Sequence, residues 1–433
     1  MIDLRLLWTW DHCIQWSAAR AGMHDWGASN EYPGTAEDFL RETSLMVRWC
    51  GQNGIDGVVI WGLLRDGHGG VETATRLCEV ADEAGVKVLA GIGLNAYGGV
   101  YYEGASEWSL NNHLAKHPEL FAFRADGERH ILLPQSFMPQ PMLHACPSRP
   151  ENMEYMQDGL HWLMETVPVH GVQVEAGDTY CCECPLCLER RQHPISAMSW
   201  EDMALLYAPA TEAVLSVKPD ATVVLETYSH SDLAPEGEVP TFGGGSPSWA
   251  AECLAQFPRE AYVQWVGDSV TAPTNSVEWT SRAPEGFAGN IMRTHHATWW
   301  RRRGEEVAVD WLAEVARKSL AHGFNGLSIF GEKGASRTGS ELNYLALADY
   351  GSAANPEADL DSYLRRVAGP LLGGEELAAE FLRLARLIDA PEELDGAVTA
   401  ARRQAAKLEG RPADRWTWLA WYLGRFVYDR DLT

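Results

Sequence analysis

The sequence predicts an α/β protein, a (β/α)8 TIM barrel followed by a C-terminal helical region. Eight short apolar runs with strand character alternate with helical patterns between residues 4 and 330, and eight is the strand number of this barrel. No glycine-rich dinucleotide fingerprint follows the first run, which disfavours a doubly wound open sheet. The strand-like runs stop after Asn355. We therefore expect a barrel over residues 1–355 and a helical region packed on it over residues 356–433.

The expected strands are 4–10, 57–61, 86–91, 171–175, 222–226, 261–265, 289–293 and 326–330. Helical patterns separate them. One begins at a capping box of Thr35 and Asp38, one ends at Gly85, and one covers residues 307–320. The C-terminal region carries four further helical patterns, at 360–372, 375–387, 392–408 and 414–428.

Charge and composition exclude several classes of partner. The 433 residues include 35 basic and 60 acidic side chains, a net charge of −25 with histidine neutral. This acidity argues against nucleic acid, because phosphate binding needs a positive surface. No apolar stretch is long enough to span a membrane, and no apolar signal core is seen at the N-terminus, so we expect a cytoplasmic protein. The oligomeric state stays open, with a homo-oligomer as one alternative.

Tryptophan is unusually frequent, with 18 Trp against 14 Tyr and 11 Phe. An indole offers a broad apolar face and one N–H donor. Such faces suit the C–H surfaces of sugar rings, although core packing accounts for about half of these residues equally well. The aromatic composition is therefore compatible with a carbohydrate ligand.

Functional residues of such a barrel lie at the C-terminal ends of its strands. Here those positions are rich in carboxylates, histidines and aromatic side chains, which suits the two carboxyl groups that glycoside hydrolysis needs. The candidate catalytic carboxyls are Glu175, Asp178, Glu226 and Glu332. The candidate substrate-binding residues are Asp11, His12, Trp61, Arg65, His68, Tyr97, Tyr101, Tyr228, Trp265, Arg293, His295 and Trp299.

Roles can be divided among these carboxyls. We expect Glu175 or Asp178 to be the general acid and Glu226 or Glu332 to oppose it. Strand alternation places Glu175 on the same face as Gln173, plausibly toward the barrel interior. The seventh expected strand ends without a carboxylate, which counts against the commonest retaining arrangement. Two mechanisms remain: an inverting pair of carboxyls, or attack by the substrate's own acetamido group.

Cysteines form the sharpest local motif. Cys182, Cys184 and Cys187 make a C-x-C-x-x-C pattern just after the fourth expected strand, and three thiolates so close together can hold a soft metal such as Zn²⁺. Cys146 is the preferred fourth ligand, with Cys181 as an alternative. The zinc would pin the loop after the third expected strand to the loop after the fourth, so it would be a structural support. No cofactor is expected for catalysis. A disulfide or free thiols are the other interpretations.

Several segments resemble a group of bacterial barrels. They are His117–Phe121, Asp126–Gly127, Cys146–Glu151, Val174–Asp178 with the following cysteines, and Leu345–Pro356. In this order they resemble glycoside-hydrolase-like TIM barrels, the superfamily that includes family 20 β-hexosaminidases and α-glucuronidase-related proteins, over roughly residues 1–370. The resemblance implies a glycosidase. Family 20 enzymes carry an adjacent Asp-Glu pair after strand four. Asp178 matches the Asp, but Thr179 follows it, so acetamido-assisted chemistry is in doubt.

Three functions follow from these observations. The first is a glycoside hydrolase, exo-acting because long loops after the first and third strands could close a site around a chain end. The second is a metal-dependent sugar isomerase or epimerase, with Glu175, Asp268, His295 and Glu332 as ligands of Mn²⁺ or Mg²⁺. The third is a non-catalytic carbohydrate-binding barrel. We favour the hydrolase, with a carbohydrate as its substrate.

Overall fold

The computed structural model describes residues 1–17, 34–132, 142–176, 181–193, 199–233, 245–267, 282–294 and 306–432. The chain divides into two compact units. One contains residues 3–295 and 322–332, and the other contains residues 1–2, 296–321 and 333–433. Each unit is described by itself below.

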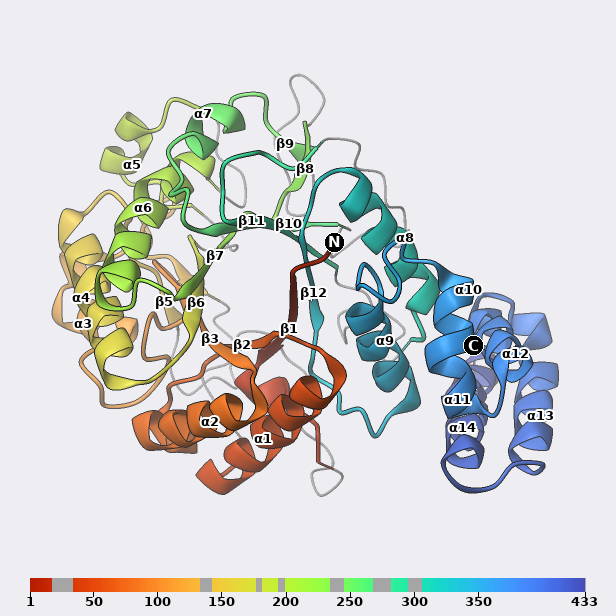
Figure 1. The fold of residues 1–433 in the computed structure, drawn as a ribbon. Coiled ribbons are helices and arrows are strands. Elements are labelled where there is room, and N and C mark those ends of the chain that lie inside the picture. The colour runs from red at the N-terminus through yellow and green to blue at the C-terminus, as the bar shows by residue number, and fades with distance from the viewer. Residues whose placement is uncertain are drawn as a thin grey trace. The chain divides into compact units, whose positions relative to one another are not determined.

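The first unit is a closed eight-stranded parallel barrel, and Figure 1 shows its strands arranged in a ring. Its strands follow one another around the ring in chain order. They are β1 (Leu4–Trp10), β2 (Gly57–Trp61), β3 (Lys87–Gly93), β6 (Gly171–Glu175), β7 (Thr222–Glu226), β10 (Tyr262–Val266), β11 (Gly289–Arg293) and β12 (Gly326–Phe330). All eight expected strands are present, and the predicted (β/α)8 fold is confirmed.

Helices surround this ring on the outside (Figure 1). They are α1 (Ala36–Asn53), α2 (Gly70–Ala84), α3 (Leu110–Lys116), α4 (Pro150–Thr166), α5 (Pro185–Arg190), α6 (Trp200–Val217) and α7 (Ala250–Leu254). Two short sheets lie in the connections: β4 (Ile131–Leu132) with β5 (Met142–Leu143), and β8 (His230–Leu233) with β9 (Gly245–Ser246). The expected capping box begins α1, because Thr35 and Asp38 each bind the other's backbone N–H.

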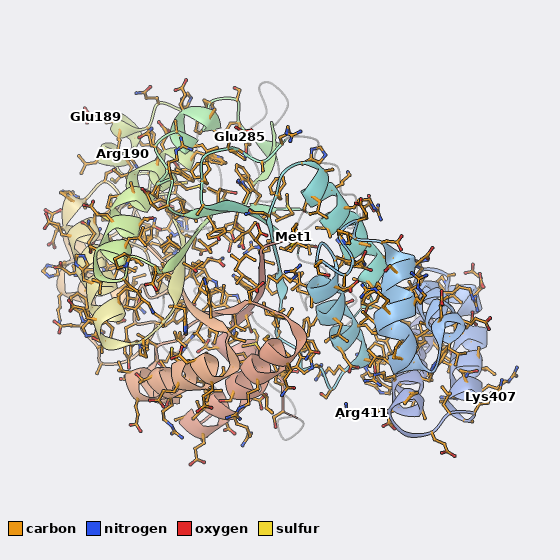
Figure 2. The ribbon with its side chains drawn as sticks, viewed as in Figure 1. Met1, Glu189, Arg190, Glu285, Lys407 and Arg411 are labelled. Atoms are coloured by element: carbon orange, nitrogen blue, oxygen red, sulfur yellow. The ribbon has the colours of Figure 1, made fainter. Side chains whose placement is uncertain are left out.

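Side chains fill the ring that the strands enclose (Figure 2). Cα partners at one level of a parallel sheet face the same side, so the register assigns the inward residues of every strand. Trp8 on β1 pairs with Phe330 on β12, and Trp61 on β2 pairs with Gly91 on β3. A Cβ on Gly91 would lie 2.5 Å from the Trp61 ring, so this position has to be glycine for the indole to lie inside the barrel.

The second unit is helical. It contains α8 (Val309–Ala321), α9 (Thr338–Asp349), α10 (Leu360–Tyr363), a π-helical turn over Leu364–Ala368, α11 (Gly369–Leu372), α12 (Glu375–Ala385), α13 (Leu394–Ala405) and α14 (Gly410–Leu432). Trp416 is buried there and donates its indole N–H to the Leu372 carbonyl at 3.0 Å, while Arg415 makes a paired contact with Glu341 at 2.7 Å. The expected C-terminal helical region is confirmed. Its packing on the barrel and the boundary at residue 355 stay predictions. No helix within the described ranges is long and apolar enough to cross a bilayer.

Candidate active site

Two carboxyl groups end neighbouring strands inside the barrel. Glu175 is the last residue of β6 and Glu226 is the last residue of β7. The β6–β7 register pairs Val174 with Leu225, so the next residues along, the two glutamates, lie side by side on the inward face. Both are buried. The structure thus brings together two of the four carboxyls that the sequence analysis proposed as catalytic.

Glu226 lies among donors from three other strands and from the loop that follows β7. Its Oε2 accepts hydrogen bonds from the side-chain amides of Gln173, at 3.3 Å, and Gln264, and it forms an ion pair with Arg293 Nη1 at 2.9 Å. Its Oε1 accepts the backbone N–H of Tyr228 at 3.0 Å. Burial would lower the pKa of Arg293, but the facing Glu226 carboxylate raises it, so the guanidinium stays charged.

Glu175 has the opposite environment. Burial raises the pKa of Glu175 from 4.5 to about 8, and the nearby Glu226 charge acts in the same direction. The Tyr228 hydroxyl and Arg293 oppose this shift without cancelling it. Neither carboxyl oxygen has a well-aligned donor among the described residues. Glu175 is therefore a protonated acid at neutral pH, beside a carboxylate paired with arginine.

Two tyrosines at the strand ends adopt the left-handed conformation. Tyr97, after β3, and Tyr228, after β7, each have φ of 51°. This region costs a non-glycine residue about 1–3 kcal/mol and is found most often at functional sites. The turn at Tyr228 places its ring over the Arg293 guanidinium, 4.5 Å from the ring centroid. The unfavourable backbone conformation of Tyr228 therefore lies next to the pair of Glu175 and Glu226.

Aromatic rings line the opposite side of the barrel interior. The Trp61 ring lies 5.3 Å from Trp10, 6.1 Å from Trp8 and 5.9 Å from Tyr97. Trp8 faces Arg293, whose guanidinium carbon lies 5.5 Å from the ring centroid. The buried indole N–H groups of Trp10 and Trp61 have no acceptor among the described residues. These rings could give a sugar both an apolar face and N–H donors.

Asp11 is the centre of a second buried group of charges. Arg65 Nε donates to its carboxylate at 2.5 Å, and His12 Nδ1 and His68 Nε2 lie 3.1 and 3.5 Å from it. Burial would raise the pKa of Asp11, but Arg65 and the two histidines together hold it well below its ordinary value. Gly62, with φ of 77°, is needed because a Cβ there would lie 2.6 Å from Asp11 Oδ1. Four predicted binding residues are thus joined in one network.

The remaining candidates lie apart or outside the described residues. Trp265 faces away from the interior, because Gln264 faces inward; its ring packs 6.0 Å from Trp200 of α6, and its N–H binds Asn290. The Tyr101 hydroxyl donates to Asp66 at 2.6 Å. Glu332 is buried after β12, and its backbone carbonyl accepts from Gln15. Asp178, Asp268, His295 and Trp299 lie outside the described residues.

Three polar residues near the charges were not among the predicted site residues. Gln173 and Gln264 bind Glu226, and Tyr102 lies under Arg65, 4.2 Å from the guanidinium carbon to the ring centroid. The signal for the glutamines was present in the sequence. Each occupies an inward position in a strand, where a polar side chain requires a buried partner.

Four cysteines that could hold a metal ion converge in the loops of the same unit. The ligand atoms of Cys146, Cys182, Cys184 and Cys187 all lie within 4.8 Å of one another, and all four residues are buried. Cys181 is not part of this group. None of the nine cysteines, all of which lie in the described ranges, forms a disulfide.

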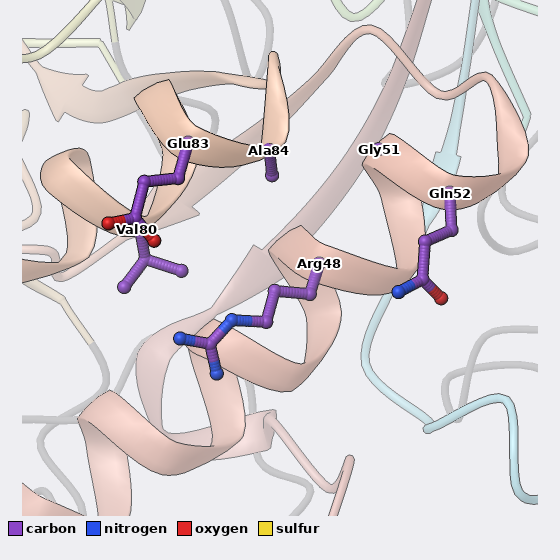
Figure 3. Close-up of a pocket in the computed structure, with 6 residues that line it drawn as sticks. All are labelled: Arg48, Gly51, Gln52, Val80, Glu83 and Ala84. Carbon is purple, nitrogen blue, oxygen red and sulfur yellow. The ribbon is translucent and has the colours of Figure 1, made fainter.

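A hollow of about 340 Å³ lies on the outer layer, between α1 and α2 (Figure 3). It is lined by Arg48, Gly51, Gln52, Val80, Glu83 and Ala84. The two helices approach closely at Gly51, where a Cβ would lie 2.3 Å from the Ala84 carbonyl oxygen. None of the predicted site residues lines this hollow, so we assign it no role.

Fold and site together define a (β/α)8-barrel protein with a buried acid pair at its strand ends. No protein-family model matches the chain, and no curated protein matches it. Similar solved structures include a glycoside hydrolase family 20 β-N-acetylglucosaminidase (11% identity, 87% of this chain and 75% of that one, TM-score 0.46). Another is the noncanonic maltogenic α-amylase AmyB from Thermotoga neapolitana, with 13% identity over 82% of this chain and 78% of that one and a TM-score of 0.45.

A third similar structure is α-L-fucosidase isoenzyme 2 from Paenibacillus thiaminolyticus (14% identity, 80% of this chain and 49% of that one, TM-score 0.45). At these identities and TM-scores, the three structures carry no argument about the family, the substrate or the activity of this chain.

Proposed function

We propose that the chain is a glycoside hydrolase in which Glu175 is the general acid and Glu226 is the opposing carboxylate. One observation carries the proposal: two buried carboxyls lie side by side at strand ends, one kept protonated by burial and the other paired with Arg293. Glycosidic bond cleavage requires such a division between a proton donor and a charged partner.

In the proposed reaction, Glu175 donates its proton to the glycosidic oxygen as the bond from that oxygen to C1 breaks. The negative Glu226 stabilises the positive charge that develops at C1, either by attack or by activating water. Water supplies the hydroxyl that C1 gains. If Glu226 attacks C1, the remaining water proton restores Glu175 directly; if Glu226 activates the water, that proton goes to Glu226, and exchange with solvent resets both carboxyls. Trp10, Trp61 and Tyr97 would hold the sugar face, and the Asp11 network would fix the neighbouring wall.

The finer features are proposals as well. We expect exo-action, because the connection between β3 and β6 is long and carries α3, a hairpin of β4 and β5, and α4. We expect a carbohydrate as the only class of substrate. We expect a reducing, cytoplasmic environment, which suits nine cysteines that form no disulfide. The distance between the two carboxyl carbons in a substrate complex will decide between retention and inversion.

A panel of aryl glycosides tests the function. The wild-type chain should hydrolyse at least one member, Glu226→Gln should be slower by a factor of about 10³ or more, and Glu83→Gln, an exposed carboxylate on α2, should match wild type. Sugar binding without turnover, unchanged in both variants, would instead support the non-catalytic barrel. Isomerisation that needs added Mn²⁺ or Mg²⁺ would support the metal-dependent alternative.

A further inference from the structure

The cysteine group joins two loops of the barrel unit. Cys146 lies between β5 and α4, in the connection from β3 to β6, and Cys182, Cys184 and Cys187 belong to the segment that follows β6 and forms α5. Their sulfur atoms converge, with Cys146 Sγ 3.6 Å from Cys184 Sγ and 3.5 Å from Cys187 Sγ. We propose that these four cysteines bind one structural zinc ion.

The spacing of the sulfur atoms fits a tetrahedral thiolate site. Four thiolates at about 2.3 Å from one Zn²⁺ lie about 3.8 Å from each other, close to the two distances above and within the 4.8 Å that contains the whole group. A disulfide requires about 2.05 Å between sulfurs, so none of these pairs is bonded. A closed set of four sulfur ligands is typical of a structural site and leaves no position for substrate.

Polar groups around the sulfurs distinguish this group from cysteines that merely fill a core. The backbone N–H of Phe123 donates to Cys182 Sγ at 3.4 Å, and the Ser148 hydroxyl lies 3.1 Å from Cys187 Sγ. Arg190, which Figure 2 labels on α5, donates to the Ser148 oxygen at 2.8 Å. A thiolate at Cys187 can only accept, so the Ser148 hydroxyl would be the donor to it. Donors of this kind orient metal-bound thiolates and offset their negative charge.

The position of the group indicates what the ion would do. Arg191 anchors the same segment, because it donates to the Cys182 carbonyl at 2.5 Å and pairs with Asp202 of α6. Cys146, from the other loop, has no covalent link to this segment. A zinc ion would supply that link and fix the chain just beyond β6, the strand that ends at Glu175. The ion would therefore act as a support for the site and would not enter the reaction.

Metal analysis of the full chain tests the proposal. Protein purified without chelators, from medium containing zinc and iron, should hold about one Zn²⁺ per chain. Cys146→Ser and Cys184→Ser should lose most of it, whereas Cys181→Ser, at the neighbouring position outside the group, should keep it. Ser148→Ala should retain the ion but bind it about tenfold or more weakly in competition with a chelator.

Two further measurements keep the proposal falsifiable if a cysteine variant fails to fold. Cobalt-loaded wild-type protein should show the visible absorption of tetrahedral thiolate coordination, and a chelator should increase alkylation of the four thiols and lower the melting temperature. A wild-type protein that binds no zinc when it is supplied would overturn the proposal. So would full zinc content in Cys146→Ser, or iron in place of zinc.

Discussion

Replacing Glu175 with glutamine removes a carboxylic acid that the fold keeps protonated. Burial raises the pKa of this group from 4.5 to about 8 in the folded chain. The folded chain therefore binds the proton more tightly than the unfolded chain. The contribution to stability is complete below about pH 4.5 and is lost as the pH rises toward about 8. Glutamine has no proton to lose, so the variant escapes this loss.

The size of the effect follows from the same pKa values. Each pH unit between the folded and unfolded pKa is worth about 1.4 kcal/mol. The rise from 4.5 to about 8 therefore corresponds to about 5 kcal/mol across the whole range, of which about 3 kcal/mol is lost by pH 7. Any change in packing caused by glutamine shifts the free energy of unfolding by the same amount at every pH, so it leaves the pH dependence intact.

Urea unfolding at intervals from about pH 5 to about pH 9 measures this difference directly. The free energy of unfolding of Glu175→Gln, minus that of wild type, should rise by about 4 kcal/mol over this range, because part of the whole effect is already lost at about pH 5. Glu83→Gln, at an exposed position, should show a nearly constant difference. Parallel curves for wild type and Glu175→Gln would refute the raised pKa and, with it, the assignment of the proton donor.

Three further variants test the surroundings of the acid. Tyr228→Phe removes a hydroxyl that favours the charged form of Glu175, so a carboxyl NMR titration should find the Glu175 pKa higher than in wild type; an unchanged or lower value would contradict the contact. Gly91→Ala places a Cβ 2.5 Å from the Trp61 ring and should cost about 1–3 kcal/mol of unfolding free energy, together with altered tryptophan fluorescence. Asp11→Asn leaves a buried arginine without its counter-ion and should cost about 3–5 kcal/mol; a loss below about 1 kcal/mol in urea unfolding would show that the network is not structural.

The fold could be predicted because its determinants are local. Each barrel strand is a short apolar run, and the helices between them carry their own stop and start signals, such as the capping box before α1. The number of runs then selects the barrel. The irregular features could not be predicted in this way. The left-handed turns at Tyr97 and Tyr228 depend on tertiary contacts, because nothing in a tyrosine favours that conformation.

The site could be predicted in part, for a different reason. Position at a strand end identifies candidates, but the parity within the strand decides which of them face inward. Glu175 and Glu226 have the inward parity. Trp265, the last residue but one of β10, has the outward parity and packs on α6, whereas its neighbour Gln264 binds Glu226. The ion pair of Arg293 with Glu226 joins strands far apart in sequence, so only the register of the closed barrel could reveal it.

The pH dependence of kcat/KM on a hydrolysed aryl glycoside tests the central claim most directly. If Glu175 is the general acid, wild type should lose activity as the pH rises through about 8, because the proton to be donated is gone. Glu175→Gln should lack this alkaline limb and should retain activity best on glycosides whose leaving groups need no protonation. Equal rates for both proteins on poor leaving groups, with the same alkaline limb, would contradict the account.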